Sequence, residues 1–131
     1  MSGWTPEQLD AVGAAAELEV ASLRSDGTLR NPVIIWVVRH DHELYVRSVN
    51  GPGSAWYRGT LTEHSGRIWA GGVEQDVSFE DADPALNDAL DAEYGHKYAR
   101  YAQSIIDHIN SQPARSTTYR LVPRTAQASA A

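Results

Sequence analysis

The chain has 131 residues, a formal net charge of -6 from 17 acidic and 11 basic side chains, and no cysteine. This length suits one domain, the acidic balance argues against a protein that mainly neutralises nucleic-acid phosphates, and the absence of cysteine excludes disulfides, zinc-thiolate sites and a thiol nucleophile. No apolar stretch is long enough to span a bilayer and no signal-peptide pattern opens the chain, so we expect a cytoplasmic protein with neither a nucleic-acid nor a membrane partner.

The first predicted element is a helix over residues 5–15. Thr5 can cap this helix, Pro6 suits its first position, and Gln8 completes a capping box. Trp4 precedes the cap, as the first member of a hydrophobic staple does. We therefore expect Trp4 to pack against the helix.

A series of strand-like segments follows this helix. Residues 17–20 alternate between acidic and apolar side chains, and Asp26-Gly27 is a strong hairpin-turn signal. The run 33–38 is apolar at both its odd and its even positions, which predicts one strand covered on both faces. Residues 44–49 predict the strand that returns beside it.

The middle of the chain begins with a glycine-rich loop. Residues 50–53 (Asn-Gly-Pro-Gly) predict this loop, after which Ser54 can cap a short helix that contains aromatic residues. Two further strands are expected over residues 67–70 and 73–79, joined by a Gly-Gly turn.

The last third of the chain alternates helix and strand signals. A second main helix is predicted to begin at Asp83-Pro84, with Gly95 as an interrupting residue. A further helical segment is expected around residues 105–109, and a closing strand over residues 117–122.

These elements predict an α+β fold that is mainly β. Five or six short antiparallel strands with several hairpins and flanking helices favour a small closed or split β-barrel. We expect a single domain over residues 1–124 and a disordered tail over residues 125–131.

Two groups of side chains have the residue types needed for metal binding or acid/base chemistry. His40 and His42 flank a predicted hairpin tip, where alternate strand residues can share a metal ion. Exposed polar turn residues explain these histidines equally well. The carboxylates of residues 80–83 can supply an acid/base pair, but they surround a helix start, where negative charge is stabilising. We therefore expect no metal site and a structural role for these carboxylates.

The glycine-rich loop 50–53 lies between a strand and a helix start, a junction whose backbone N–H groups and helix dipole suit an anion. Arg47 and Ser48 end the incoming strand, and Arg24 and Arg30 flank the preceding hairpin turn. Arginine can hold a phosphate bidentately. These side chains predict a phosphate site if they converge, and the alternative is that they pair with surface carboxylates.

Tryptophan is frequent in this chain, with four residues against a single phenylalanine. For Trp36, Trp56, Tyr57 and Trp69, packing in the core is the first interpretation, and a stacking wall for a planar ligand is the second. No P-loop, Gly-x-Gly-x-x-Gly or Gly-x-Ser-x-Gly motif is present, so neither a nucleotide cradle of these types nor a hydrolase nucleophile is predicted.

Three segments resemble one known family. Residues 22–33 resemble the opening hairpin of the deazaflavin-dependent nitroreductase-like proteins, which contains Gly and Arg and leads through Pro into a hydrophobic strand. Residues 44–51 followed by Trp56-Tyr57 are similar to their strand, glycine loop and helix start, and residues 115–124 are similar to their closing strand. More closely, almost the whole chain apart from the C-terminal tail resembles the bacterial domain-of-unknown-function family 2255.

The resemblance implies an FMN-binding-like split β-barrel, a homodimer with cofactor pockets at the subunit interface, and FMN or a deazaflavin as cofactor. By position, it makes Arg30, Ser48, Asn50 and Gly51 the phosphate contacts, and it makes the Trp-Tyr pair after the loop the wall of the ring or substrate pocket. The candidate cofactor-binding residues are therefore Arg24, Arg30, Arg47, Ser48, Asn50, Gly51, Trp56 and Tyr57.

Three features depart from the pattern of the related nitroreductase-like proteins. Asp26 replaces the usual basic residue in the hairpin turn, Arg58-Gly59 replaces the Asn-Leu that follows the aromatic pair, and Pro52 removes one N–H donor from the loop. These changes concern the cofactor and leave the fold expectation intact.

The resemblance implies a small oxidoreductase that passes a hydride from a reduced flavin or deazaflavin to a small conjugated or nitro-type acceptor. No catalytic side chain is predicted, because such a cofactor supplies the chemistry. One alternative is a non-catalytic module or carrier of the same fold that holds a flavin or a small aromatic ligand. Another is a dimeric structural protein without a cofactor.

Overall fold

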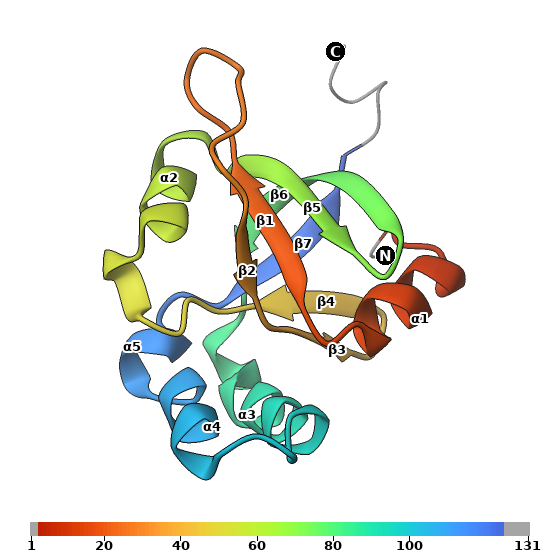
Figure 1. Ribbon diagram of the computed structural model, residues 1–131, viewed down its shortest axis with the longest axis vertical. Coiled ribbons are helices and arrows are strands. Elements are labelled where there is room, and N and C mark those ends of the chain that lie inside the picture. The colour runs from red at the N-terminus through yellow and green to blue at the C-terminus, as the bar shows by residue number, and fades with distance from the viewer. Residues whose placement is uncertain (1–2, 125–131) are drawn as a thin grey trace.

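The computed structural model describes residues 3–124, and within them the strands form one antiparallel sheet that curls into a nearly closed barrel (Figure 1). Seven strands take part, in the order β2-β1-β5-β6-β7-β4-β3. The predicted antiparallel barrel is confirmed, and the predicted tail over residues 125–131 lies outside the described residues. The strands are β1 (Leu18–Ser22), β2 (Val33–Ile35), β3 (Val37–His40), β4 (Glu43–Val46), β5 (Ser65–Ala70), β6 (Val73–Asp81) and β7 (Tyr119–Pro123).

The apolar run 33–38 contributes to both ends of the sheet, because it is interrupted at Trp36. β2 pairs with β1, with Ile34 opposite Glu19, whereas β3 pairs with β4. The prediction of one strand covered on both faces is therefore wrong. Closing a barrel brings the first and last strands of a sheet together. The corner at Trp36 lets the run 33–38 supply both of these edge strands, β2 and β3. Ile34 lies on the outside and is 60% exposed.

The tryptophans divide between the barrel interior and its outer surface. Trp4 is buried in the barrel cluster together with Leu9, as expected of a staple, and its Nε1 donates to the carbonyl oxygen of Leu121 at 2.9 Å. The interpretation of Trp36 as a core residue is confirmed in part, because it packs against the cluster outside the barrel and not within the barrel. Its ring is half-buried and stacks on Tyr98 outside the barrel, with ring centroids 3.8 Å apart.

The helices lie around the barrel (Figure 1). The capping box is confirmed, since Thr5 Oγ1 accepts from the amide of Gln8 at 3.1 Å and Gln8 Oε1 accepts from the amide of Thr5 at 3.0 Å. No helix within residues 3–124 has the length and apolarity needed to cross a membrane. The helices are α1 (Pro6–Ala14), the 3₁₀ helix η1 (Gly51–Gly53), α2 (Ala55–Glu63), the 3₁₀ helix η2 (Pro84–Leu86), α3 (Asn87–Lys97), α4 (Gln103–Ile109) and the unexpected α5 (Gln112–Arg115).

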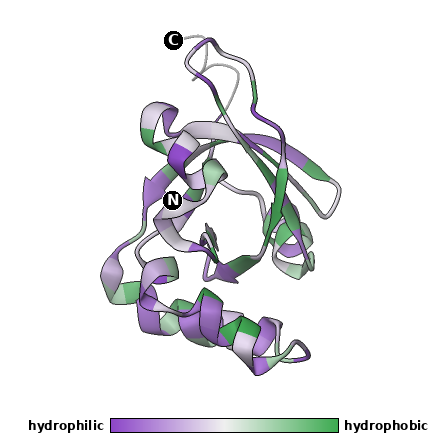
Figure 2. Ribbon diagram, turned by 60° about the vertical axis from the view of Figure 1, so that its left-hand side comes forward, coloured by the Kyte–Doolittle hydropathy of each residue, from purple (hydrophilic) through white to green (hydrophobic). Residues whose placement is uncertain are grey.

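Apolar side chains gather in two clusters. One fills the barrel and contains residues from most of the strands, together with Trp4 and Trp56. The other lies between the outside of the barrel and helices α3 and α4, and it contains Tyr45, Leu90 and Ile106. Figure 2 shows these helices below the barrel, with hydrophobic and hydrophilic residues alternating along them, as expected for amphipathic helices that cover a sheet.

Gly95 lies inside α3 and does not interrupt it as predicted. A Cβ at this position meets no atom within 4 Å. We expect Gly95→Ala to raise the free energy of unfolding by about 0.5–1 kcal/mol, because alanine loses less backbone entropy than glycine in a helix. Urea denaturation measures this change.

Gly13→Ala in α1 provides the matched control, because its Cβ would lie 3.2 Å from the Cβ of Arg39. We expect this substitution to stabilise the protein less. Equal stabilisation by both substitutions would contradict the explanation that the room for a Cβ determines the gain in stability.

Candidate cofactor site

The glycine loop folds onto itself between β4 and α2. The Ser48 hydroxyl donates to the carbonyl oxygen of Gly51 at 2.7 Å and lies 2.7 Å from Ser54 Oγ. Ser54 is the N-cap residue of α2, as predicted, but its side chain is engaged with Ser48 and makes no capping hydrogen bond. The amide groups of the first turn of α2 are therefore left without a side-chain acceptor. A helix start of this kind suits an anion.

The loop is held in place by its packing. Gly51 is buried with φ +77°, and a Cβ there would lie 3.0 Å from the Cβ of Pro113 beside it. Asn50 is exposed at the outer side of the loop. The loop thus has a fixed backbone and an accessible polar side chain next to the start of α2.

Arg30 lies against the middle of α2. Its Nη1 donates to the carbonyl oxygen of Leu23 at 2.9 Å. A Cβ on Gly59 would lie 2.4 Å from Ser22 Oγ and 3.0 Å from Arg30 Nη1. Ser22 Oγ is buried and has no hydrogen-bond partner among the described residues. The structure therefore brings Arg30 and α2 together, as predicted, and Gly59 is what allows this close approach.

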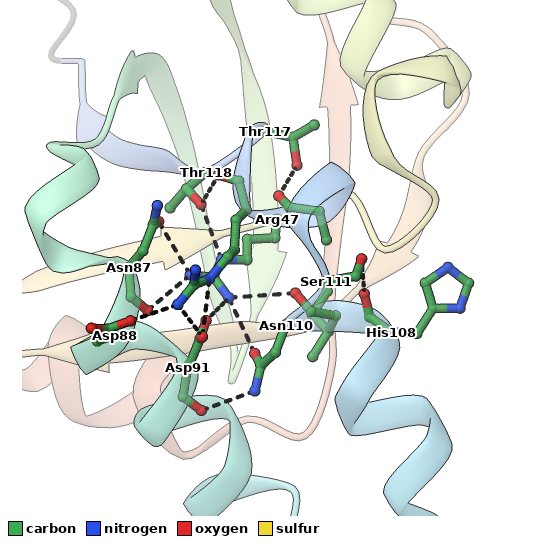
Figure 3. Close-up of polar contacts among 12 residues, drawn as sticks. Arg47, Asn87, Asp88, Asp91, His108, Asn110, Ser111, Thr117 and Thr118 are labelled. Atoms are coloured by element: carbon green, nitrogen blue, oxygen red, sulfur yellow. Dashed lines mark hydrogen bonds and ion pairs between the residues drawn. The ribbon is translucent and has the colours of Figure 1, made fainter.

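Arg47 is fully buried under the helices that follow β6, where each of its three guanidinium nitrogens donates to a protein oxygen (Figure 3). Nη1 donates to Asp91 Oδ1 at 2.6 Å and to Asn110 Oδ1 at 3.1 Å, and Nε donates to Thr118 Oγ1 at 3.0 Å. Arg115 Nη2 lies 2.6 Å from the other oxygen of Asp91. Asp91 therefore neutralises two arginines that come from different parts of the chain.

The Arg47 network carries one buried group without a partner. The Arg47 guanidinium lies 5.3 Å from the centre of the Tyr94 ring, and the Tyr94 hydroxyl has no hydrogen-bond partner among the described residues. Burial raises the pKa of Tyr94 above its usual range. The predicted role of Arg47 in holding a cofactor anion stays a prediction.

The two aromatic residues after the loop point to different places. Trp56 is buried in the barrel cluster, with its ring centroid 6.3 Å from that of Phe79. Tyr57 is half-buried and stacks on Tyr119 at 5.2 Å. Tyr57 also borders a polar cavity of about 430 Å³, and Arg115 is one of the other residues that line this cavity. Of this pair, Tyr57 is the residue that faces a cavity.

An apolar cavity of about 250 Å³ lies between the corner at Trp36 and helix α4. The sequence does not indicate this cavity, because its walls come from segments that each resemble ordinary core. Two of its residues are exposed, Ile34 at 60% and Ile105 at 44%. The residues that line it are Glu17, Ile34, Ile35, Trp36, Arg47, Val49, Ile105 and Ile109.

The histidines and carboxylates take part in local contacts. His40 Nδ1 lies 3.0 Å from Glu93 Oε2, and the Asp83 carboxylate accepts from the amide of Ala85 at 2.9 Å, at the start of η2. Within residues 3–124, no group of three or more His, Cys, Asp and Glu side chains is arranged to hold a metal ion. Asp83 has the structural role expected at a helix start.

Residues 8–121 match the family model described as "uncharacterized protein conserved in bacteria (DUF2255)". The chain belongs to this family. A search of curated proteins gave no match.

Among solved structures, an F420 reductase resembles this DUF2255 chain with a TM-score of 0.60 at 13% identity, over 88% of this chain and 92% of the reductase. The heme storage protein HutZ from Vibrio cholerae has a TM-score of 0.59 at 17% identity, over 92% and 90% of the two chains. A protein assigned to 5-nitroimidazole antibiotic resistance, from Bacteroides thetaiotaomicron, has a TM-score of 0.55 at 13% identity, over 91% and 79%. At these identities the likeness establishes the fold, a split barrel with flanking helices.

The hairpin of this DUF2255 chain explains one of its departures from the nitroreductase-like pattern. The hairpin extends beyond the barrel past α2 (Figure 1). Asp26 Oδ1 accepts from the hydroxyl of Thr28 at 2.7 Å and from its amide at 3.0 Å, and these hydrogen bonds lower the pKa of Asp26. Arg24 is exposed and donates to the carbonyl oxygen of Leu29 at 2.9 Å. Asp26 thus stabilises the turn, and Arg24 stabilises the hairpin through its hydrogen bond to Leu29.

Proposed function

We propose that this chain binds FMN or a deazaflavin and acts as a small oxidoreductase on a conjugated or nitro-type acceptor. The observation that carries the proposal is the approach of Arg30 and the unpartnered Ser22 hydroxyl to α2, a helix whose first turn lacks a side-chain cap. The likeness to an F420 reductase and to a protein assigned to nitroimidazole resistance supports it. When bound, such a cofactor supplies hydride transfer.

The residues on the hairpin and the glycine loop fit the phosphate end of such a cofactor. Arg30 uses one guanidinium nitrogen for the carbonyl oxygen of Leu23, which leaves other N–H groups for a phosphate oxygen. The Ser22 hydroxyl is a buried donor without a partner in the described residues. In our proposal Arg30 and Asn50 hold the phosphate together with the start of α2, and Arg24 steers the anion from the hairpin. Ser48 and Gly51 shape the loop, because the Ser48 hydroxyl and the Gly51 amide already donate within it.

The apolar cavity beside Trp36 fits the ring end. Its walls are mainly branched aliphatic side chains with one indole, together with Glu17 and Arg47, and such walls suit the apolar faces of a flat ring. Ile34 and Ile105 border this cavity and remain exposed in the single chain. We propose that a second copy of the chain covers them, so that a homodimer completes the pocket. In this proposal Tyr57, which lines the polar cavity, meets the polar part of the ligand.

Arg30→Ala tests the phosphate cradle. We expect the dissociation constant for FMN or a deazaflavin to rise about tenfold to a hundredfold, because a charged hydrogen bond contributes about 1–3 kcal/mol. Titration followed by visible absorbance and by quenching of tryptophan fluorescence measures it. Arg67→Ala provides the control, since the ion pairs of Arg67 on β5 are with Glu74 and Asp76 of β6 and not with the hairpin or the loop.

Three results separate the candidate functions. Unchanged affinity in Arg30→Ala would remove Arg30 from the site. A bound cofactor that no nitro or conjugated acceptor reoxidises would favour the carrier over the oxidoreductase. A heme spectrum in place of a flavin spectrum, in protein purified from its native host, would favour heme binding, as the name of the HutZ structure describes for that protein.

A further inference from the structure

Lys97 is the sole lysine among the 131 residues of the sequence. It ends α3 and is half-buried between that helix and the barrel. Its Nζ donates to the carbonyl oxygen of Val37 at 2.6 Å and lies 5.2 Å from the centre of the Tyr98 ring. Within residues 3–124, no ion pair joins Lys97 to a carboxylate. Its amine therefore has a hydrogen-bond acceptor but no counter-charge.

The surroundings of Lys97 favour the neutral amine. Burial lowers the pKa of Lys97 to about 8, and a neutral lysine amine is a nucleophile. The neighbouring Tyr98 hydroxyl donates to the carbonyl oxygen of Ala16 at 2.9 Å. Burial is also the main cause that raises the pKa of Tyr98, to about 12.

Lys97 lines a cavity of about 300 Å³ that shares no lining residue with the apolar or polar cavities described above. Three alanines leave space in it, and His96 and Arg100 add basic groups at the end of α3. Arg100 is exposed, and its guanidinium lies 5.6 Å from the Tyr101 ring centre. In a chain of net negative charge, this cavity is a local basic site that suits a small anion.

We propose that Lys97 is an acylation site for small anionic acyl donors of the acyl-phosphate class, with Arg100 and His96 holding the phosphate. The Nζ lone pair attacks the acyl carbon, so that a new N–C bond forms. The C–O bond to phosphate then breaks, phosphate leaves with that electron pair, and the amine loses one proton to water. The product is an amide and inorganic phosphate.

The acylated side chain still fits the position it occupies. An amide N–H can continue to donate to the carbonyl oxygen of Val37, and the acyl group enters the space between the alanines of the cavity. Acylation also removes a charge that burial disfavours. The modified chain is therefore expected to keep its fold.

Acetyl phosphate tests this proposal on the full chain at neutral pH. Peptide mapping by mass spectrometry follows Lys97 separately from the N-terminal amine. The reference is Thr62→Lys, which adds a lysine at an exposed position of α2. We expect Lys97 to be acetylated about tenfold faster than the introduced lysine, because a lower pKa leaves more free amine even though it reduces intrinsic nucleophilicity. A rate no higher than that of the introduced lysine would overturn the proposal.

Arg100→Gln tests the recognition of the anion. We expect it to slow acetylation of Lys97 by acetyl phosphate about tenfold, as for the loss of one charge-assisted hydrogen bond. It should leave the rate with an uncharged acetyl ester unchanged, because the amine itself is intact. Equal rates of the variant and the parent chain with acetyl phosphate, or equal slowing with both reagents, would overturn the assignment to anionic donors.

Discussion

Replacing Asp91 with alanine is expected to lower the free energy of unfolding by about 3–5 kcal/mol, which is the usual cost of leaving a buried charge without its partner. Asp91 is 24% exposed, whereas Arg47 is 0% exposed and cannot regain water when the carboxylate is lost. The same change leaves Arg115 without its main partner. Denaturation in urea, followed by tryptophan fluorescence and circular dichroism, measures the loss.

Two substitutions act as controls for this result. Asp88→Ala removes a carboxylate that is 96% exposed and that also binds Arg115, and we expect a loss below about 1 kcal/mol. Arg47→Met removes the buried charge itself and leaves Asp91 paired with Arg115, so its cost should be smaller than that of Asp91→Ala. If Arg47→Met is as costly as Asp91→Ala, the buried charge is not the cause.

Gly71→Ala is expected to lower the free energy of unfolding by about 2–4 kcal/mol, from a left-handed backbone and a steric clash together. Gly71 has φ +56° in the turn between β5 and β6. A Cβ there would lie 2.3 Å from the carbonyl oxygen of Ala11, so that α1 would have to move away from the barrel. The change in the urea midpoint measures the effect.

The neighbouring Gly72 separates the two contributions. It has φ +83°, but a Cβ on it meets no atom within 4 Å. Gly72→Ala should therefore cost only about 1–2 kcal/mol from backbone strain. Equal losses for the two variants would show that the contact with α1 contributes nothing.

Local signals in the sequence predicted those parts of the fold that local physics determines. The capping box at Thr5 and the Asp26-Gly27 turn depend on residues within a few positions of one another, and both are present. The break at Trp36 was not predicted, because a run that is apolar at every position gives no sign that its first half pairs with one strand and its second half with another. That change depends on barrel closure, which joins residues far apart in the chain.

The same distinction applies to the candidate site. The resemblance pointed to Arg30 and to α2, which lie side by side. It did not reveal the partners of Arg47, because Asp91 lies 44 positions further along and Thr118 lies 71 positions further. No spacing rule connects residues so far apart, and the apolar cavity beside α4 escaped prediction for the same reason.

The place of β7 in the sheet has a consequence for the order of assembly. β7 comes after every other strand in the chain, yet it pairs with β6 on one side and with β4 on the other. Until residues 119–123 have left the ribosome, nothing joins the strands β2-β1-β5-β6 to the pair β4-β3, and β6 and β4 each have an open edge. Such edges are sites where chains pair wrongly with each other. The barrel therefore closes late in synthesis, and a chain truncated before β7 is expected to aggregate rather than to fold as a smaller barrel.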